Sequence, residues 1–151
     1  MKLTNKQFVL KTMKAYGKNM AQNVQQQSDS MTGTQLYEKK EFIPDFQTAK
    51  TLKNMLNRSI GFVCKSTAGR VVKLIQLYDS DIYSQEPEEL SAQWGFKWST
   101  NPEDALPFIA LATSPYDVGE CCIENDIVYR SKIPNNVYSP SSYPQGWEVV
   151  N

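Results

Sequence analysis

The chain has 151 residues, of which 40% are hydrophobic and 21% are charged. Sixteen basic and sixteen acidic residues give a formal net charge of zero, which argues against a protein that binds nucleic acid mainly through phosphate contacts. No apolar run approaches the roughly 20 residues needed to span a bilayer, so we expect no membrane-spanning segment.

Three cysteines and no histidine narrow the chemistry that the chain can carry out. Cys64, Cys121 and Cys122 are an odd number with an adjacent pair, which is not the pattern of a disulfide framework. Without histidine the chain lacks the commonest general base and the commonest metal ligand. A three-cysteine zinc site would also need other spacings and a fourth ligand. We therefore expect no metal, no cofactor and no Cys–His nucleophile pair.

The first predicted element is a long amphipathic helix over residues 4–27. Thr4 and Gln7 match a capping box, in which each side chain bonds the backbone N–H of the other residue. Apolar residues then recur at steps of three and four, which places them on one helical face: Val9, Met13, Tyr16, Met20 and Val24. This face is narrow, so we expect the helix to dock on a partner or on its own copies. These five residues are candidate oligomerisation contacts of a homo-oligomer.

Five lysines lie in the same helical stretch, and no acidic residue precedes Asp29: Lys2, Lys6, Lys11, Lys14 and Lys18. Such a stripe is compatible with contact to nucleic acid or to a membrane surface. We favour a solvated lysine face beside the oligomer contacts, because the chain as a whole carries no net charge.

The middle of the chain is predicted as a connecting region. Residues 25–34 are polar and read as a linker, residues 35–47 look extended, and residues 47–56 suit a short helix. From residue 60 onward, short apolar runs alternate with turn residues, which is typical of small antiparallel β modules. The predicted fold class is α+β, with an assembly helix (1–29), a connecting segment (30–59) and two β modules (60–112 and 113–151).

The two β modules resemble each other weakly, which predicts a tandem duplicated unit. The matching stretches are residues 61–98 and 119–150. The matched positions keep their order along the chain: Gly61 with Gly119, Cys64 with Cys122, Ile82–Ser84 with Val137–Ser139, and Gln93-Trp94 with Gly146-Trp147. A unit of about 35 residues is small for independent folding, so we expect the two copies to pack together.

Residues 116–150 carry a recognisable order of aromatic, glycine and turn residues: Tyr116, Gly119-Glu120, Asn125-Asp126, Val128-Tyr129, Tyr138, Pro140 and Trp147. This order resembles small chitin-binding-type carbohydrate-binding modules of families 5 and 12. The similarity is closest to the form found at the ends of tailed-bacteriophage virion proteins. Two positions depart from the pattern: one aromatic of the usual loop pair is replaced, and Asp126 stands where the strand turn normally has glycine.

Sugar rings present a C–H face that stacks on aromatic rings, while their hydroxyls bond to amides and carboxylates. The resemblance and this chemistry give a set of candidate carbohydrate-binding residues: Tyr138, Tyr143, Asn135, Asn136, Trp147, Tyr83 and Trp94. In a domain this small, aromatics also serve as core, and we favour that role for Trp94, Trp98, Tyr129 and Trp147. For Tyr138 and Tyr143 both roles remain open.

The resemblance implies a non-enzymatic virion structural protein that displays carbohydrate-binding-type modules for attachment to host-surface glycans. An alternative is a module for protein–protein packing within the particle that binds no sugar. Glycoside hydrolysis needs two carboxyl groups at a set separation, but the candidate acids lie in polar, proline-flanked stretches: Glu86, Glu88, Glu89, Glu103 and Asp104. We therefore expect no enzyme, and we do not expect a nucleic-acid partner.

The segment MKLTNKQFVLKTMKAYG has no unbroken apolar core and no small-residue cleavage site, so it does not match a secretory signal. We expect synthesis in the cytoplasm of a host bacterium, a final location in the virion, and other virion proteins as partners.

Overall fold

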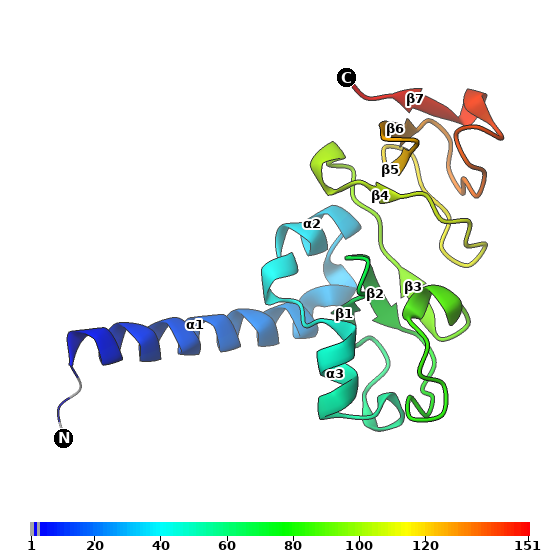
Figure 1. The fold of residues 1–151 in the computed structure, drawn as a ribbon. Helices are drawn as coiled ribbons and strands as arrows, with labels where there is room; N and C mark the ends of the chain where they lie inside the picture. The colour runs from blue at the N-terminus through cyan, green and yellow to red at the C-terminus, as the bar shows by residue number, and fades with distance from the viewer. Residues whose placement is uncertain (1, 3) are drawn as a thin grey trace.

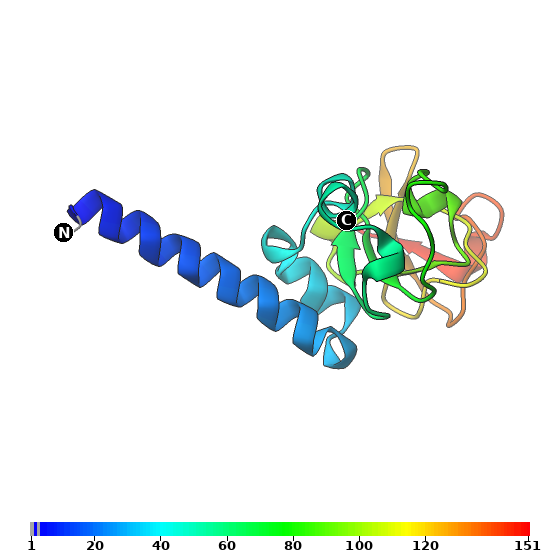
Figure 2. The same cartoon turned by 90° about the horizontal axis from the view of Figure 1, so that it is seen from below.

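A computed structural model describes residue 2 and residues 4–151, and it begins with a single long helix. Helix α1 spans Asn5–Gln27, and the Thr4 side chain caps it while the Gln7 side chain bonds back to the Thr4 backbone. The predicted helix and its capping box are therefore confirmed. The amino-terminal half of α1 projects away from the remainder of the protein, which gathers at the other end of the helix (Figures 1 and 2).

The carboxy-terminal end of α1 is fixed to the body of the protein. Val24 is buried beside apolar residues of the following helices and the first sheet, among them Leu36 and Val71. The Gln25 side chain donates to the Val63 carbonyl at 2.7 Å and accepts from the Val63 N–H at 2.9 Å. The last turns of α1 are thus part of the folded body, whereas the first turns are not.

Short helices fill the segment between α1 and the sheets. They are η1 (Ser28–Ser30), α2 (Gly33–Glu38), η2 (Lys40–Phe42), α3 (Phe46–Leu52) and η3 (Met55–Asn57). Helix α3 confirms the short helix expected in this region. The extended conformation expected for residues 35–47 is wrong, because a second capping box between Thr32 and Gln35 starts α2 there.

Two small sheets make up the rest of the chain. The first has strands β1 (Val63–Lys65), β2 (Val71–Leu74) and β3 (Trp94–Phe96), paired antiparallel in that order. The second has β4 (Leu106–Pro107), β5 (Cys121–Glu124), β6 (Ile127–Ser131) and β7 (Trp147–Val149), with β4 parallel to β5 and the others antiparallel. Three single turns precede strands: η4 (Pro87–Glu89), η5 (Pro102–Asp104) and η6 (Pro144–Gly146). The α+β fold class is confirmed.

The two sheets repeat the same backbone hydrogen bonds around their first hairpins. The Gly61 N–H donates to the Leu74 carbonyl at 2.7 Å, and the Gly119 N–H donates to the Ser131 carbonyl at 2.9 Å. In return Leu74 donates to Phe62, and Ser131 donates to Glu120. Both glycines have positive φ, 97° and 91°. The predicted match between residues 61 and 119 is therefore reproduced in three dimensions.

The closing strands repeat as well. Leu74 pairs with Trp94 across β2 and β3, and Ser131 pairs with Trp147 across β6 and β7. Each tryptophan ring meets a phenylalanine edge on, Phe46 at 5.7 Å and Phe108 at 6.1 Å. These phenylalanines follow short parallel pairings, Asp45 with Lys65 and Pro107 with Ile123. The structural repeat thus begins earlier than the sequence match, near residues 44 and 106.

The repeat loses its sequence register in the long loops. In both units an Asp or Asn side chain accepts from the backbone N–H two residues later, Asp79 from Asp81 and Asn136 from Tyr138. This turn aligns Tyr138 with Asp81. The expected match of Ile82–Ser84 with Val137–Ser139 is therefore wrong, because the first loop is longer and the similar side chains fall out of step.

One core joins the two sheets. Trp98, which follows β3, stacks on Tyr116, which precedes β5, with ring centroids 4.4 Å apart. The same buried cluster holds Cys64 from the first unit and Cys122 from the second. Strand β4 lies inside the range expected for the first module, yet it pairs with β5. The two units are therefore halves of one folded body.

Candidate functional site

The loop between β6 and β7 is held by its own buried polar residue. Asn136 is fully buried and donates from Nδ2 to Ser131 Oγ at 3.1 Å and to the Gly146 carbonyl at 3.2 Å. Its backbone bonds that of Tyr116 in both directions, at 2.7 and 2.9 Å. The Trp147 indole N–H donates to the Tyr138 carbonyl at 2.9 Å. These bonds fix the loop from inside.

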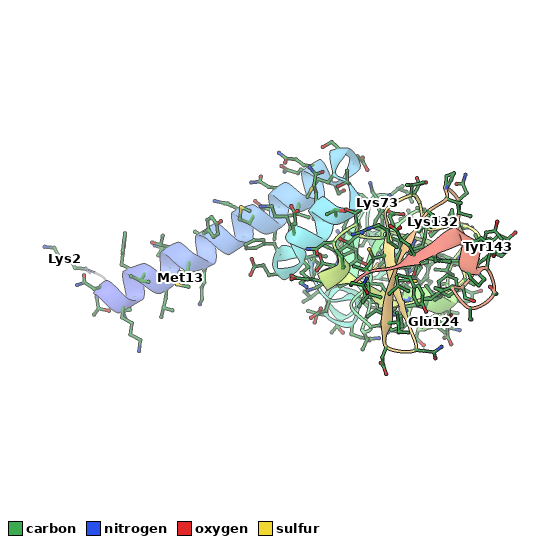
Figure 3. The ribbon with its side chains drawn as sticks, turned by 90° about the horizontal axis from the view of Figure 1, so that it is seen from above. Lys2, Met13, Lys73, Glu124, Lys132 and Tyr143 are labelled. Carbon is green, nitrogen blue, oxygen red and sulfur yellow. The ribbon has the colours of Figure 1, made fainter. Side chains whose placement is uncertain are left out.

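Two aromatic side chains remain outside this framework. Tyr138 and Tyr143 are 54% and 38% exposed, and their ring centroids lie 5.4 Å apart with the planes tilted by 55°. The tip of the loop is tied to the β5–β6 hairpin, because the Ser141 N–H donates to Glu124 Oε1 at 2.9 Å. Tyr143 lies at the end of the molecule opposite Met13 of α1 and Lys2, which precedes the helix (Figure 3).

The remaining candidate sugar contacts fall into two groups. Asn136, Trp94 and Trp147 are buried, and their side-chain N–H groups bond within the fold, Trp94 to the Tyr78 hydroxyl at 3.0 Å. They therefore act as framework, as expected for the two tryptophans. Asn135 is exposed in the same loop as the tyrosine pair and has a positive φ of 51°. Tyr83 is exposed as well, but it lies in the corresponding loop of the first unit.

The candidate oligomerisation residues also divide. Val9, Met13 and Tyr16 are exposed, Met20 is half-buried, and Val24 is buried in the protein's own core. The Tyr16 ring meets Phe42 edge on at 6.1 Å. The free part of the face is thus its amino-terminal half. Sequence reasoning missed that Phe8 and Leu10 are also exposed, because they lie off the regular three-and-four spacing.

A groove at the base of α1 was not expected from the sequence. It has a volume of about 730 Å³ and lies between α1, from Gly17 to Gln26, and the segment from Glu41 to Pro44, with Phe62 beside it. None of the loop aromatics lines it. The signal that could have indicated it is the pair of small residues, Gly17 and Ala21, on an otherwise long-chained helix.

Three of the five acidic residues considered for catalysis are engaged in structural contacts, and the other two, Glu89 and Glu103, are exposed. Glu88 forms a salt bridge with Arg70 at 3.2 Å, and Asp104 forms one with Lys40 at 3.3 Å. Glu86 accepts from the Thr67 N–H at 2.7 Å. Within residue 2 and residues 4–151, no group of three or more His, Cys, Asp or Glu side chains is placed to hold a metal ion.

The cysteines are buried and unreactive in character. Burial raises the pKa of the Cys122 thiol to about 12 and raises that of Cys64 still further. Cys121 and Cys122 are both buried, on opposite sides of β5 as adjacent strand residues must be. All three are free thiols, and their burial indicates a packing role.

A comparison of the chain with protein-family models, with curated proteins and with solved structures found no match. The likeness to carbohydrate-binding modules therefore stays a prediction from the residues quoted above. Across the described part of the chain, no helix combines the length and apolar character needed to cross a membrane.

Proposed function

We propose that the chain is a non-enzymatic structural protein of a bacteriophage virion, a component of the tail, fibre or capsid surface. In this proposal its β body displays carbohydrate-binding-type loops for attachment to host-surface glycans, and α1 joins it to further copies and other virion proteins. The resemblance of residues 116–150 motivates the virion assignment. The exposed Tyr138–Tyr143 pair on a loop held from inside carries the binding role.

The physical argument for sugar binding rests on preorganisation. A loop fixed by Asn136, Trp147 and the Ser141–Glu124 bond loses little conformational freedom when a ligand binds. Two partly exposed tyrosine rings supply apolar faces and hydroxyls, and the amide of Asn135, exposed in the same loop, supplies donors and an acceptor. Such a site binds weakly alone, so repetition through an oligomer increases its avidity.

The separation of the two ends supports the division of roles. The free half of α1 and the tyrosine loop lie at opposite ends of the molecule (Figures 2 and 3). An assembly contact through α1 therefore leaves the loop open to solvent. The structural contacts made by Glu86, Glu88 and Asp104 support a non-enzymatic role.

The test is binding of the full chain to chitin and to purified bacterial wall polysaccharides. We expect retention of the protein on at least one of these polymers and loss of that retention in the Tyr138→Ala/Tyr143→Ala variant. Val118→Ala is the matched control, because Val118 is similarly exposed on the same unit. Unchanged retention after loss of both tyrosines would contradict the assignment of this loop.

A second candidate is a packing module that binds no sugar and contacts another virion protein through the same loop. Two observations favour it. The tyrosine planes are tilted by 55° and so form no flat platform, and the Asn136 amide is used within the fold. Failure of every polysaccharide to retain the protein, together with burial of Tyr138 at a subunit contact, would favour this candidate.

A further inference from the structure

The groove at the base of α1 has free space next to the helix, because two small residues of α1 lie beside it. On its helical side the groove is lined by the small residues Gly17 and Ala21 and by polar residues from Lys18 to Gln26, so α1 places no large apolar side chain there. Phe42, Ile43 and Phe62 are among the residues opposite. A Cβ atom placed on Gly17 would meet no neighbouring atom within 4 Å. The groove therefore has room for large apolar side chains where the helix carries none.

The same helix offers side chains of that kind in its projecting half. Val9, Met13, Gly17 and Ala21 follow one another at steps of four, so they form a single ridge inclined to the helix axis. The ridge is bulky in the projecting half and small beside the groove. Two such helices placed antiparallel, with a two-fold axis that passes between Met13 and Gly17 on the ridge side, bring Met13 opposite Gly17 and Val9 opposite Ala21.

Charge favours the antiparallel orientation over the parallel one. Helix α1 has four lysines, all at or before residue 18, and no acidic residue, so a parallel pair sets like charges side by side. Glu41 lies at the groove, is exposed, and forms no salt bridge within the described residues. In the antiparallel pair it faces the lysine-bearing half of the other helix. Lys14 of that helix lies at the level of Tyr16, whose ring meets Phe42 next to Glu41.

We propose that the protein forms a two-fold dimer in which the Val9–Met13 end of each α1 lies in the groove of the other copy. This arrangement rests on the assembly role of α1 in the proposed function and specifies its geometry. It also explains the projecting helix, since isolated helices shorter than about 12–15 residues are marginal in water without a packing partner.

The test is disulfide cross-linking of the full chain under mild oxidation, with two single-cysteine substitutions mixed. Cross-linking needs Cα atoms within about 7 Å, and the three native cysteines are buried. We expect Met13→Cys mixed with Gly17→Cys to give mainly the mixed dimer, and Val9→Cys mixed with Ala21→Cys to do the same. Phe8→Cys is the control, since Phe8 is as exposed as Met13 (62% and 63%) but lies off the ridge.

A charge exchange gives an independent readout that needs no cysteine. Glu41→Lys should weaken the dimer about two- to thirtyfold in Kd, because the two-fold dimer contains this exposed ion pair twice. Adding Lys14→Glu should restore the affinity.

If Met13→Cys cross-links to itself and gives no mixed product, the helices are parallel and the groove proposal is overturned while assembly through α1 stands. A monomeric molar mass for the unmodified chain would overturn both.

Discussion

The two β units share a framework but complete it differently. In both, a glycine with positive φ opens the unit, a cysteine lies in the core, and a tryptophan begins the closing strand. In the first unit the Trp94 indole bonds a tyrosine hydroxyl, whereas in the second the Trp147 indole bonds a backbone carbonyl. The first unit buries its tryptophan against α3, and the second uses its tryptophan to hold the tyrosine loop.

This difference indicates that the two units, which share one framework, have different structural roles. The first unit carries helices on both sides: α3 packs beside Trp94, and Val63 and Val71 face α1 and α2. The second unit has no helix packed on its outer face, and its loop residues reach solvent (Figure 1). The first unit anchors α1, and the second is free to present a surface.

The largest expected effect comes from removing the tryptophans. Trp94→Ala should lower the free energy of unfolding by about 3–5 kcal/mol, because it leaves a large cavity in the core. Trp147→Ala should cost somewhat less, since Trp147 lies nearer the surface. Urea unfolding followed by circular dichroism measures both. Because the two units share one core, each variant should unfold in a single transition, and separate transitions for the two units would contradict the shared core.

The next largest effect depends on the acceptor of each indole N–H, which differs between Trp94 and Trp147. Tyr78→Phe removes the hydroxyl that accepts from Trp94 Nε1 and leaves a buried N–H without a partner, which should cost about 1–3 kcal/mol. The second unit has no corresponding weakness, because its acceptor is a backbone carbonyl. Urea unfolding of this variant, beside Tyr83→Phe as an exposed control, gives the difference. Equal stability of the two variants would show that the Tyr78 hydroxyl makes no net contribution.

The opening glycines should behave alike if the units are equivalent. Gly61→Ala and Gly119→Ala should each cost roughly 1–2 kcal/mol, because an L side chain disfavours positive φ. The nearest atoms to an added Cβ lie at 3.7 and 3.5 Å, so no clash adds to either cost. Thermal or urea unfolding compares the pair. A large difference between them would argue against the structural equivalence.

The smallest expected effect is a dependence on pH to which Asp79 of the first unit contributes and its counterpart in the second unit does not. Bonds from the Asn54 side chain and the Asp81 N–H lower the pKa of Asp79 below its usual 3.8. Its contribution to stability is therefore present above pH 3.8 and is lost as the pH falls through the lowered pKa. The corresponding residue of the second unit, Asn136, does not titrate. Asp79→Asn should flatten the acid limb of the stability profile, measured by unfolding between pH 5 and 2.5, and an unchanged limb would contradict this.

Local patterns in the sequence were sufficient for much of the fold. The Thr4 capping box and the apolar spacing from Val9 to Val24 predicted α1, and alternation with turn residues predicted the sheets. The register of the long loops was not accessible, because similar side chains at Tyr83 and Tyr138 were matched while the backbone bonds align Asp81 with Tyr138. Helix α2 was missed because its capping box lies in a polar stretch.

The sequence indicated which residue types make up the candidate site, but it did not indicate which of these side chains are exposed. The composition of the last loop indicated a set of aromatics and amides, yet only tertiary packing decides that Tyr138 faces solvent while Asn136 is buried. The groove beside Gly17 was equally inaccessible, since it forms between segments that are distant in the sequence. Both cases depend on long-range contacts that local spacing does not encode.

In the proposed dimer the projecting half of α1 binds another copy of the chain, and this contact can be tested directly. Light scattering coupled to size exclusion tests it on the full chain, on Val9→Gln/Met13→Gln and on Phe8→Gln. Point substitutions are preferable to removal of α1, because Val24 and Gln25 belong to the folded body. We expect twice the 17.2 kDa chain mass for the full chain and for Phe8→Gln, and a single chain mass for the double variant. A single chain mass for the unmodified protein at all concentrations would contradict it.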